Sequence, residues 1–344
     1  MSRKAPRPVP PTSRDVAARA GVSPMTVSRA LRRPELVSEA TRERVRSAVR
    51  ELDYVPDLVA GALSSQRSGH VAVLAPSLRH TGFLRTIEGL AAGLREHGYA
   101  LLIGESFYST DEELELLRVI LGRRPEAIVL VARMSSEPAR RLLLNAGIPV
   151  VETWDWPIEP MDMVVGFSQQ AAGHAMTCSL IEQGYQRIGF LAGSAESDPY
   201  GDMRRQGYLS ALAEHGLPLD RLVSTGDRPM EIEDGAAGVA ELRRRWPDSD
   251  ALFCATDLIA LGALDECARH GWRVPHDIAI AGHGNFDFSA SVSPSLSTVE
   301  VPGRRIGETA AALIAARIEG GDVELDERQD LGFTLLHRQS TRRT

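Results

Sequence analysis

The sequence has few cysteines, a single lysine and no long apolar run. Its three cysteines, Cys178, Cys254 and Cys267, form no Cys-x-x-Cys pair, which is typical of free thiols in a reducing compartment. No apolar run approaches the ~20 residues that a membrane-spanning helix needs. The N-terminus is basic and rich in proline and leads into no apolar segment, so we expect no secretory signal. A cytoplasmic protein without a membrane partner is the first expectation.

The negative total charge conceals two segments of opposite sign. The 344 residues carry a formal net charge of −7. Residues 1–68 hold 13 Lys and Arg against 7 Asp and Glu, a net of +6, and the remaining 276 residues have a net of −13. This asymmetry suggests a basic module, suited to nucleic acid, that is joined to an acidic body. The length suggests two or three domains.

The chain changes character along its length. We predict five segments, namely a disordered arm (1–11), a helical domain (12–55), a short helix and linker (56–68), a two-lobed core (69–336) and a tail (337–344). In the core, short apolar strands alternate with amphipathic helices, which indicates parallel sheets built from βαβ units. Roughly nine strands or more over about 260 residues predict two doubly wound lobes, with a ligand between them at the carboxyl ends of the strands.

The expected elements of the core follow from this alternation. The predicted strands include His70–Ala75, Tyr99–Gly104, Ala127–Ala132, Ile148–Glu152, Met163–Phe167, Arg187–Ala192, Ala251–Ala255 and Asp277–Ala281. The predicted helices include Phe83–His97, Glu112–Leu121, Gln169–Gln183, Tyr208–His215 and Asp257–His270.

The N-terminal segment has the pattern of three short helices. Thr12 and Asp15 form a capping-box pair that opens the first helix, and Gly21 ends it. Ser23 caps the second helix and Ser38 caps the third. Two short helices joined by a glycine-containing turn are typical of a helix-turn-helix, whose second helix enters the DNA major groove.

The outward face of the second helix supplies the candidate DNA contacts. An arginine can bond two acceptors of guanine, while hydroxyls and a helix N-terminus suit phosphate oxygens. A plain helical hairpin is the alternative, and the net charge of +6 over residues 1–68 disfavours it. The candidate residues are Ser23, Pro24, Met25, Thr26, Ser28 and Arg29.

These motifs resemble a known family. DVAxxAGVSxxTVSRxL, followed by VSxxTRxRVxxAxxxLxYxP, resembles the LacI/GalR family of bacterial transcription repressors over residues 12–68. The βα alternation through about residue 336 is similar to that family's two-lobed sugar-binding core. The resemblance implies an all-α helix-turn-helix headpiece and an α/β core of two doubly wound parallel-sheet lobes, similar to periplasmic binding proteins. Met-Thr-Val-Ser-Arg29 and Asp330-Leu-Gly-Phe-Thr-Leu335 look closest to the repressors of gluconate utilisation.

The resemblance also implies roles in DNA binding. The family's base-reading positions fall on Pro24, Met25 and Arg29. Direct polar readout would therefore depend on Arg29, and Met25 would touch a thymine methyl group. The family's hinge helix corresponds to Pro56–Ser64. Leu63 would be the apolar wedge that opens a base step in the minor groove.

A segment similar to the family's Arg-x-x-Gly-aromatic sequence predicts an effector contact. Its first arginine corresponds to Arg204, which would hold the carboxylate of a sugar acid in two hydrogen bonds. A surface arginine at a helix start is the alternative, and Arg205 offers a competing register. Asp257 follows a predicted strand, where it is equally well explained as a ligand contact or as a helix N-cap.

Further effector candidates follow other predicted strands. His283 and Asn285 stand near the position where many relatives carry an aromatic residue and two aspartates, and the loss of both carboxylates favours an anionic ligand. Trp154 offers a stacking face and Asp155 a hydroxyl acceptor, although core packing is the alternative for this loop. Ser77 and Phe83 flank the end of the first strand.

Taken together, we expect a repressor of sugar or sugar-acid catabolism genes that binds operator DNA as a homodimer or larger assembly. The effector would be gluconate or a related sugar acid bound between the lobes. The alternatives are a solute-binding protein or a sugar-processing enzyme on the same core. No Gly-x-Ser-x-Gly, P-loop or Gly-x-Gly-x-x-Gly motif and no metal-binding histidine spacing is present, so we expect no enzyme, no cofactor and no metal.

Overall fold

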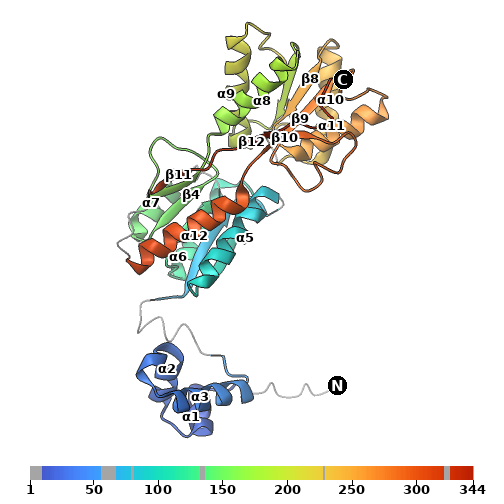
Figure 1. Ribbon diagram of the computed structural model, residues 1–344. Helices are drawn as coiled ribbons and strands as arrows, with labels where there is room; N and C mark the ends of the chain where they lie inside the picture. The colour runs from blue at the N-terminus through green and yellow to red at the C-terminus, as the bar shows by residue number, and fades with distance from the viewer. Residues whose placement is uncertain are drawn as a thin grey trace, which may run out of the picture. The chain divides into compact units, whose positions relative to one another are not determined.

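The computed structural model describes residues 10–55, 67–78, 81–131, 136–227, 229–320 and 326–343 (Figure 1). The chain divides into two compact units, Met1–Ser68 and Gly69–Thr344. Within the described ranges, no helix is long and apolar enough to cross a membrane.

The N-terminal unit contains α1 (Ser13–Ala20), α2 (Pro24–Arg32), the 3-10 helix η1 (Pro34–Leu36) and α3 (Glu39–Glu51). The predicted capping box is confirmed, because the Thr12 hydroxyl accepts from the Asp15 amide and the Asp15 carboxylate accepts from the Thr12 amide. The Ser23 hydroxyl caps α2 by accepting from the Thr26 amide at 3.1 Å. Ser38 occupies the N-cap position of α3, but its hydroxyl bonds the Thr41 hydroxyl instead of a backbone amide.

The three helices share a small apolar core, and this core orients α2. Burial of apolar side chains, at about 25 cal/mol per Å² of apolar surface, is the main force that stabilises such a unit. The buried members are Val16, Ala17, Ala20, Val27, Val45 and Ala48.

The core unit contains two six-stranded sheets, each covered by helices on both faces. In the N-terminal lobe the strand order is β11-β5-β4-β3-β1-β2, and the paired strands are parallel. Its strands are β1 (His70–Ala75), β2 (Ala100–Glu105), β3 (Ile128–Val131), β4 (Val150–Thr153), β5 (Met163–Gly166) and β11 (Arg328–Asp330). Its helices are α5 (Thr81–Glu96), α6 (Thr110–Gly122), α7 (Glu137–Ala146) and α12 (Gly303–Glu319).

In the C-terminal lobe the order is β12-β10-β9-β8-β6-β7, and only β12 is antiparallel to its neighbour within the described pairs. Its strands are β6 (Ile188–Ala192), β7 (Leu222–Ser224), β8 (Ala251–Cys254), β9 (Ala279–His283), β10 (Ser297–Glu300) and β12 (Thr334–Leu336). Its helices are α8 (Gln169–Glu182), α9 (Pro199–Glu214), α10 (Ile232–Arg245) and α11 (Asp257–Arg269). Figure 1 shows α8 and α9 on one face of this sheet and α10 and α11 on the other.

The chain passes between the lobes along three segments, which follow β5, β10 and β11. The main apolar core is continuous across these crossings, since it includes residues of both sheets. The predicted fold class, a helical headpiece and two doubly wound lobes, is confirmed.

Glycines allow three helix pairs to pack with their backbones in close contact. At Gly173 of α8, an added Cβ would lie 2.2 Å from the carbonyl oxygen of Arg204 on α9. At Gly207 of α9, an added Cβ would lie 2.0 Å from the carbonyl oxygen of Gln170. The pairs α5/α12 and α10/α11 approach through glycines in the same way. The close α8/α9 contact fixes the backbone position of Arg204, the predicted effector contact.

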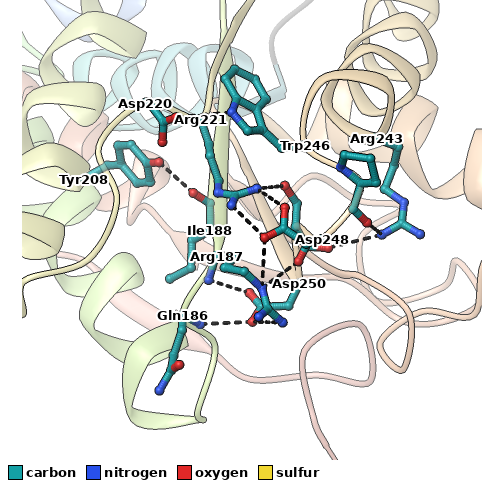
Figure 2. Close-up of polar contacts among 12 residues, drawn as sticks. Gln186, Arg187, Ile188, Tyr208, Asp220, Arg221, Arg243, Trp246, Asp248 and Asp250 are labelled. Carbon is teal, nitrogen blue, oxygen red and sulfur yellow. Dashed lines mark hydrogen bonds and ion pairs between the residues drawn. The ribbon is translucent and has the colours of Figure 1, made fainter.

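A polar cluster closes the amino ends of β6, β7 and β8 (Figure 2). The buried Arg221 donates two hydrogen bonds to the Asp248 carboxylate, at 2.8 and 3.0 Å. The backbone amides of Gln186 and Arg187 donate to the Asp250 carboxylate at 3.1 and 2.9 Å. The hydrogen bond from Arg221 lowers the pKa of Asp248. This cluster lies at the end of the sheet opposite to the carboxyl ends of the strands, where the effector residues were predicted.

The predicted strands and helices correspond to observed elements with small shifts at their ends, with one larger exception. Helix α9 begins at Pro199 and not at Tyr208, because the Asp198 carboxylate caps it by accepting from the Gly201 amide at 2.8 Å. Proline suits the first helical position, where its missing N–H costs nothing. Four strands of three or four residues were not predicted because they lack an apolar run, namely β7, β10, β11 and β12.

Candidate functional site

The exposed face of α2 is the candidate DNA-binding surface. Pro24, Ser28 and Arg29 are exposed, and Met25 is 64% exposed. The Thr26 hydroxyl is partly buried and lies 2.9 Å from the Ser23 hydroxyl. The Arg29 guanidinium forms no hydrogen bond or ion pair with any residue that the structure describes. A long cationic side chain is therefore available to an external acceptor.

Three of the four arginines of α3, Arg42, Arg46 and Arg50, differ from Arg29 because each lies within 4.0 Å of a carboxylate. Arg50 donates to Glu43 at 2.9 Å, and Arg42 pairs with Glu39 on the same helix. Same-helix pairs of this kind reduce the net positive field around α3. Arg29 of α2 has no carboxylate of this kind beside it among the described residues.

The predicted hinge Pro56–Ser64 and its wedge residue Leu63 lie outside the described residues. Their role in DNA binding stays a prediction.

In the core unit, Arg204 is buried at the start of α9 with only part of its hydrogen-bonding capacity used. The residue is 4% exposed, and its Nη1 donates to Gln169 Oε1 at 2.6 Å. Its Nη2 lies 3.8 Å from Asp198 Oδ1. Its Nε is buried and has no hydrogen-bond partner among the described residues. A buried donor without a partner costs about 1–3 kcal/mol, so a ligand acceptor at this position would relieve that cost.

Gln169 connects Arg204 to the N-terminal lobe. Its Nε2 donates to the carbonyl oxygen of Trp154 at 2.9 Å. Trp154 is 1% exposed, donates through its indole to Thr86 at 2.9 Å, and packs edge-on against Phe83 with ring centroids 4.9 Å apart. Both side chains therefore pack in the core, which for Trp154 is the packing alternative predicted from the sequence. A ligand contact by either residue stays a prediction.

Asp155 follows Trp154 and is 6% exposed. One of its carboxylate oxygens accepts from the Trp156 amide at 2.7 Å. Ser77 is partly buried and follows β1. Both residues lie at the carboxyl ends of strands of the N-terminal sheet, where a ligand is expected in this class of fold.

His283 belongs to the C-terminal sheet and lies near Trp154 and Phe167. It ends β9, is 1% exposed and stacks on Phe167 with ring centroids 6.2 Å apart. Phe167 lies on the first crossing between the lobes and also packs against Trp154, with ring centroids 6.1 Å apart. We call the group Tyr108, Trp154, Phe167, Gln169, Asp198, Arg204 and His283 the interlobe site.

Asn285 and Asp257 use their side chains within the C-terminal lobe. The Asn285 amide donates to Glu300 at 2.9 Å and accepts from Arg338 at 2.8 Å. The Asp257 carboxylate accepts from the Phe286 amide and from the hydroxyls of Ser289 and Thr298, at distances of 2.5 to 2.9 Å. Burial raises the pKa of Asp257, and these bonds oppose that shift.

The N-cap interpretation of Asp257 is wrong. Thr256 occupies the N-cap position of α11, and Asp257 is the first helical residue. The carboxylate of Asp257 instead fastens α11 to the loop after β9 and to β10. A ligand contact by Asp257 stays a prediction.

Four residues of the interlobe site were not predicted: Tyr108, Phe167, Gln169 and Asp198. Tyr108 lies in the loop after β2 with φ 59° and is 40% exposed. Desolvation of its hydroxyl, followed by the Asp198 carboxylate, raises its pKa. Because the charges of Asp198 and Arg204 both act on its hydroxyl, Tyr108 approaches them from the other lobe. The Asp198-Pro199 pair was a readable helix-start signal, whereas no local signal marks Tyr108.

The site suits a small polar ligand that carries an acceptor for Arg204. Buried Asp198 Oδ2 and Thr256 Oγ1 also have no hydrogen-bond partner among the described residues. Within the described ranges, no three His, Cys, Asp or Glu residues are placed to hold a metal ion.

A helix-turn-helix unit joined to a two-lobed core with a polar site at the strand ends defines a ligand-responsive DNA-binding regulator. The sequence profile of bacterial regulatory proteins, lacI family, matches residues 12–57, and that of the periplasmic binding protein-like domain matches residues 178–341. The chain is 38% identical over 331 residues to the HTH-type transcriptional regulator GntR of Pseudomonas aeruginosa, covering 96% of each chain.

Two further comparisons agree. The chain is 35% identical over 326 residues to the HTH-type transcriptional regulator GntR of Escherichia coli K12, covering 94% of this chain and 97% of the other. A LacI-family transcriptional regulator structure from Silicibacter pomeroyi has 34% identity and a TM-score of 0.90, covering 97% of this chain and 100% of that one. The chain belongs to the lacI family of bacterial regulatory proteins and is a DNA-binding transcriptional regulator. The named relatives are regulators and not enzymes.

Proposed function

We propose that the protein represses genes of sugar or sugar-acid catabolism and that gluconate, or a related sugar acid, controls its affinity for operator DNA. The observation that carries this proposal is the buried Arg204 guanidinium, whose Nε has no hydrogen-bond partner among the described residues. A carboxylate accepts two parallel hydrogen bonds from a guanidinium, which are stronger than bonds between neutral groups. Because operator DNA is the target, we place the protein in the cytoplasm.

In this proposal Arg29 reads a guanine, Met25 contacts a thymine methyl group, and the α2 N-terminus with Ser23, Thr26 and Ser28 approaches phosphates. The exposure of Arg29 and Met25 supports these roles. Pro24 has no side-chain donor and contributes shape only.

We further propose that the protein binds DNA as a homodimer, because two recognition helices read two half-sites. The edge strand β2 supports this proposal. Ile103 on β2 is 44% exposed and Val119 on α6 is 61% exposed. They line a depression of about 500 Å³ together with Leu101 and Leu116. An exposed apolar edge of this kind is typical of an interface between chains.

The dimer is tested by the variant Val119→Asp. Sedimentation should change from a dimer to a monomer, because a charge would be buried in the interface. Leu144→Asp is the control, since Leu144 on α7 is also exposed, at 55%, and lies outside the depression. A dimer that persists in Val119→Asp would contradict this interface.

The effector is tested by thermal unfolding with gluconate, with sorbitol and with glucose. Sorbitol has the same polyol chain without the carboxylate. A ligand that binds only the folded state stabilises it by about 2.7 kcal/mol at a concentration 100 times its Kd. We expect gluconate to raise the midpoint temperature of unfolding, and we expect sorbitol and glucose to leave it unchanged. An unchanged midpoint with gluconate would contradict the proposed effector.

A further inference from the structure

The carboxylate of Asp198 lies beside Arg204, and one of its oxygens is unused. Oδ1 caps α9 by accepting from the Gly201 amide at 2.8 Å. Oδ2 is buried and accepts no hydrogen bond from the described residues, and the whole residue is 8% exposed. A Cβ at Gly201 would lie 1.8 Å from Oδ2, so the glycine leaves the room that this carboxylate occupies. A cap alone needs one oxygen, and the second is available to a ligand hydroxyl.

Two carboxylates and one guanidinium act on the Tyr108 hydroxyl in this region. Within the part of the chain that the structure describes, the charges that act on the Tyr108 hydroxyl are the Arg204 guanidinium and the carboxylates of Asp198 and Glu105. The Asp198 carboxylate lies 3.8 Å from the guanidinium. A bound ligand with one carboxylate adds one negative charge that Arg204 can meet directly. A phosphate ester adds about 1.5–2 more negative charges, which the Asp198 carboxylate would repel.

We propose that Asp198 limits the charge of the effector, so that the interlobe site takes a linear polyhydroxy carboxylate with a single negative charge and excludes its phosphate ester. Asp198 Oδ2 accepts a hydroxyl of the ligand, and its charge opposes a second anionic group. This inference rests on the proposed function and adds a specificity residue to it.

The test is isothermal titration calorimetry of the full chain with gluconate and with 6-phosphogluconate. The wild-type protein should bind gluconate at least about 30-fold more tightly than 6-phosphogluconate, because like charges in a partly buried site repel strongly. The variant Asp198→Asn retains an oxygen that can cap α9 and removes the charge. In this variant the preference for gluconate should narrow at least about tenfold.

A matched control separates this role from helix capping. Asp202 lies one turn further along α9 and pairs with Arg205, so Asp202→Asn removes the same charge outside the interlobe site. It should leave the preference unchanged. Asp198→Ala removes the cap as well, so a purely structural role would weaken both ligands together and leave their ratio constant.

The outcomes are distinguishable. If wild-type protein bound gluconate and 6-phosphogluconate equally, or if the ratio of their affinities were unchanged in Asp198→Asn, the role of Asp198 would be overturned. Gluconate binding in the same experiment would still support the proposed function. If folded wild-type protein bound neither anion, the proposed effector class would fail and this inference would fail with it.

Discussion

Arg29 of α2 is exposed and has no partner among the described residues, whereas Arg204 of α9 is 4% exposed and is held by Gln169. The first must be ordered when it meets DNA, and its attraction to phosphate is screened by salt. The second is ordered before any ligand arrives, which reduces the entropy lost on binding. The two arginines therefore suit different partners, an extended polyanion for Arg29 and a small anion for Arg204. Substitution of either arginine should therefore impair one binding activity and spare the other.

The largest expected effect is on effector binding in Arg204→Met. Methionine retains an apolar chain of similar length but cannot bond a carboxylate. Gluconate affinity should fall at least about 100-fold, or about 3 kcal/mol, because a buried charge-assisted interaction is lost. Calorimetry checks this loss, and operator affinity without gluconate should stay within about twofold of wild type. Retention of gluconate affinity in a folded variant would refute the assignment.

The reciprocal variant, Arg29→Ala, should lose sequence preference but not effector binding. Loss of a bidentate contact to guanine costs about 1–3 kcal/mol of discrimination. Fluorescence anisotropy with an operator selected from random-sequence DNA, against a scrambled duplex, measures it. Arg50→Ala is the matched control, because Arg50 is exposed on α3 and paired with Glu43. An unchanged preference in Arg29→Ala would show that base readout lies elsewhere.

Gly173→Ala tests whether the α8/α9 packing positions Arg204. The added Cβ would lie 2.2 Å from the Arg204 carbonyl oxygen. We expect a loss of about 1–3 kcal/mol in the free energy of unfolding of the core unit, together with weaker gluconate binding. Urea denaturation and calorimetry measure the two effects. Gly122→Ala on α6 is the control, since its Cβ would meet nothing within 4 Å. Equal behaviour of the two variants would contradict this account.

The smallest expected effect is a pH dependence that arises in the core unit. Burial raises the pKa of Glu113 on α6 to about 7, and its Oε1 has no hydrogen-bond partner among the described residues. The folded state therefore binds the proton more tightly than the unfolded state does. The contribution of Glu113 to stability is present in full below the unfolded pKa of about 4.5 and declines as pH rises toward 7.

Glu113→Gln should remove this dependence and raise stability at about pH 8 by roughly 1 kcal/mol, after allowance for partial solvent exposure. Urea denaturation at about pH 5.5 and about pH 8 measures the change. Glu115→Gln, which alters an exposed residue paired with Arg118, is the control. A Glu113→Gln variant that was no more stable than this control at the higher pH would contradict the assignment.

The headpiece was predictable from sequence because its signals are local. Thr12 with Asp15, and Ser23 with Pro24, mark helix starts within four residues, and the observed helices follow them. The lobes were predictable for a similar reason, since each buried parallel strand is an apolar run. The short polar strand β11 was missed, because its pairing with β5 joins segments that are distant in the sequence.

The interlobe site was predictable only in part. The resemblance to the family's Arg-x-x-Gly-aromatic segment predicts Arg204, and Asp198-Pro199 is a local helix-start signal. Tyr108 approaches Arg204 only because the two lobes are arranged around three chain crossings. Local sequence patterns do not predict that arrangement. Trp154 illustrates the opposite limit, because its residue type suggested a stacking face while its burial and its bond to Thr86 show core packing.

The central claim is that a carboxylate bound at Arg204 controls the affinity of the headpiece for operator DNA. The most direct test is a gluconate titration of the operator complex, followed by fluorescence anisotropy, for wild-type protein and for Arg204→Met in parallel. We predict that gluconate releases wild-type protein from the operator and leaves the complex with Arg204→Met intact. Release of both proteins at the same gluconate concentration, or of neither, would contradict the account.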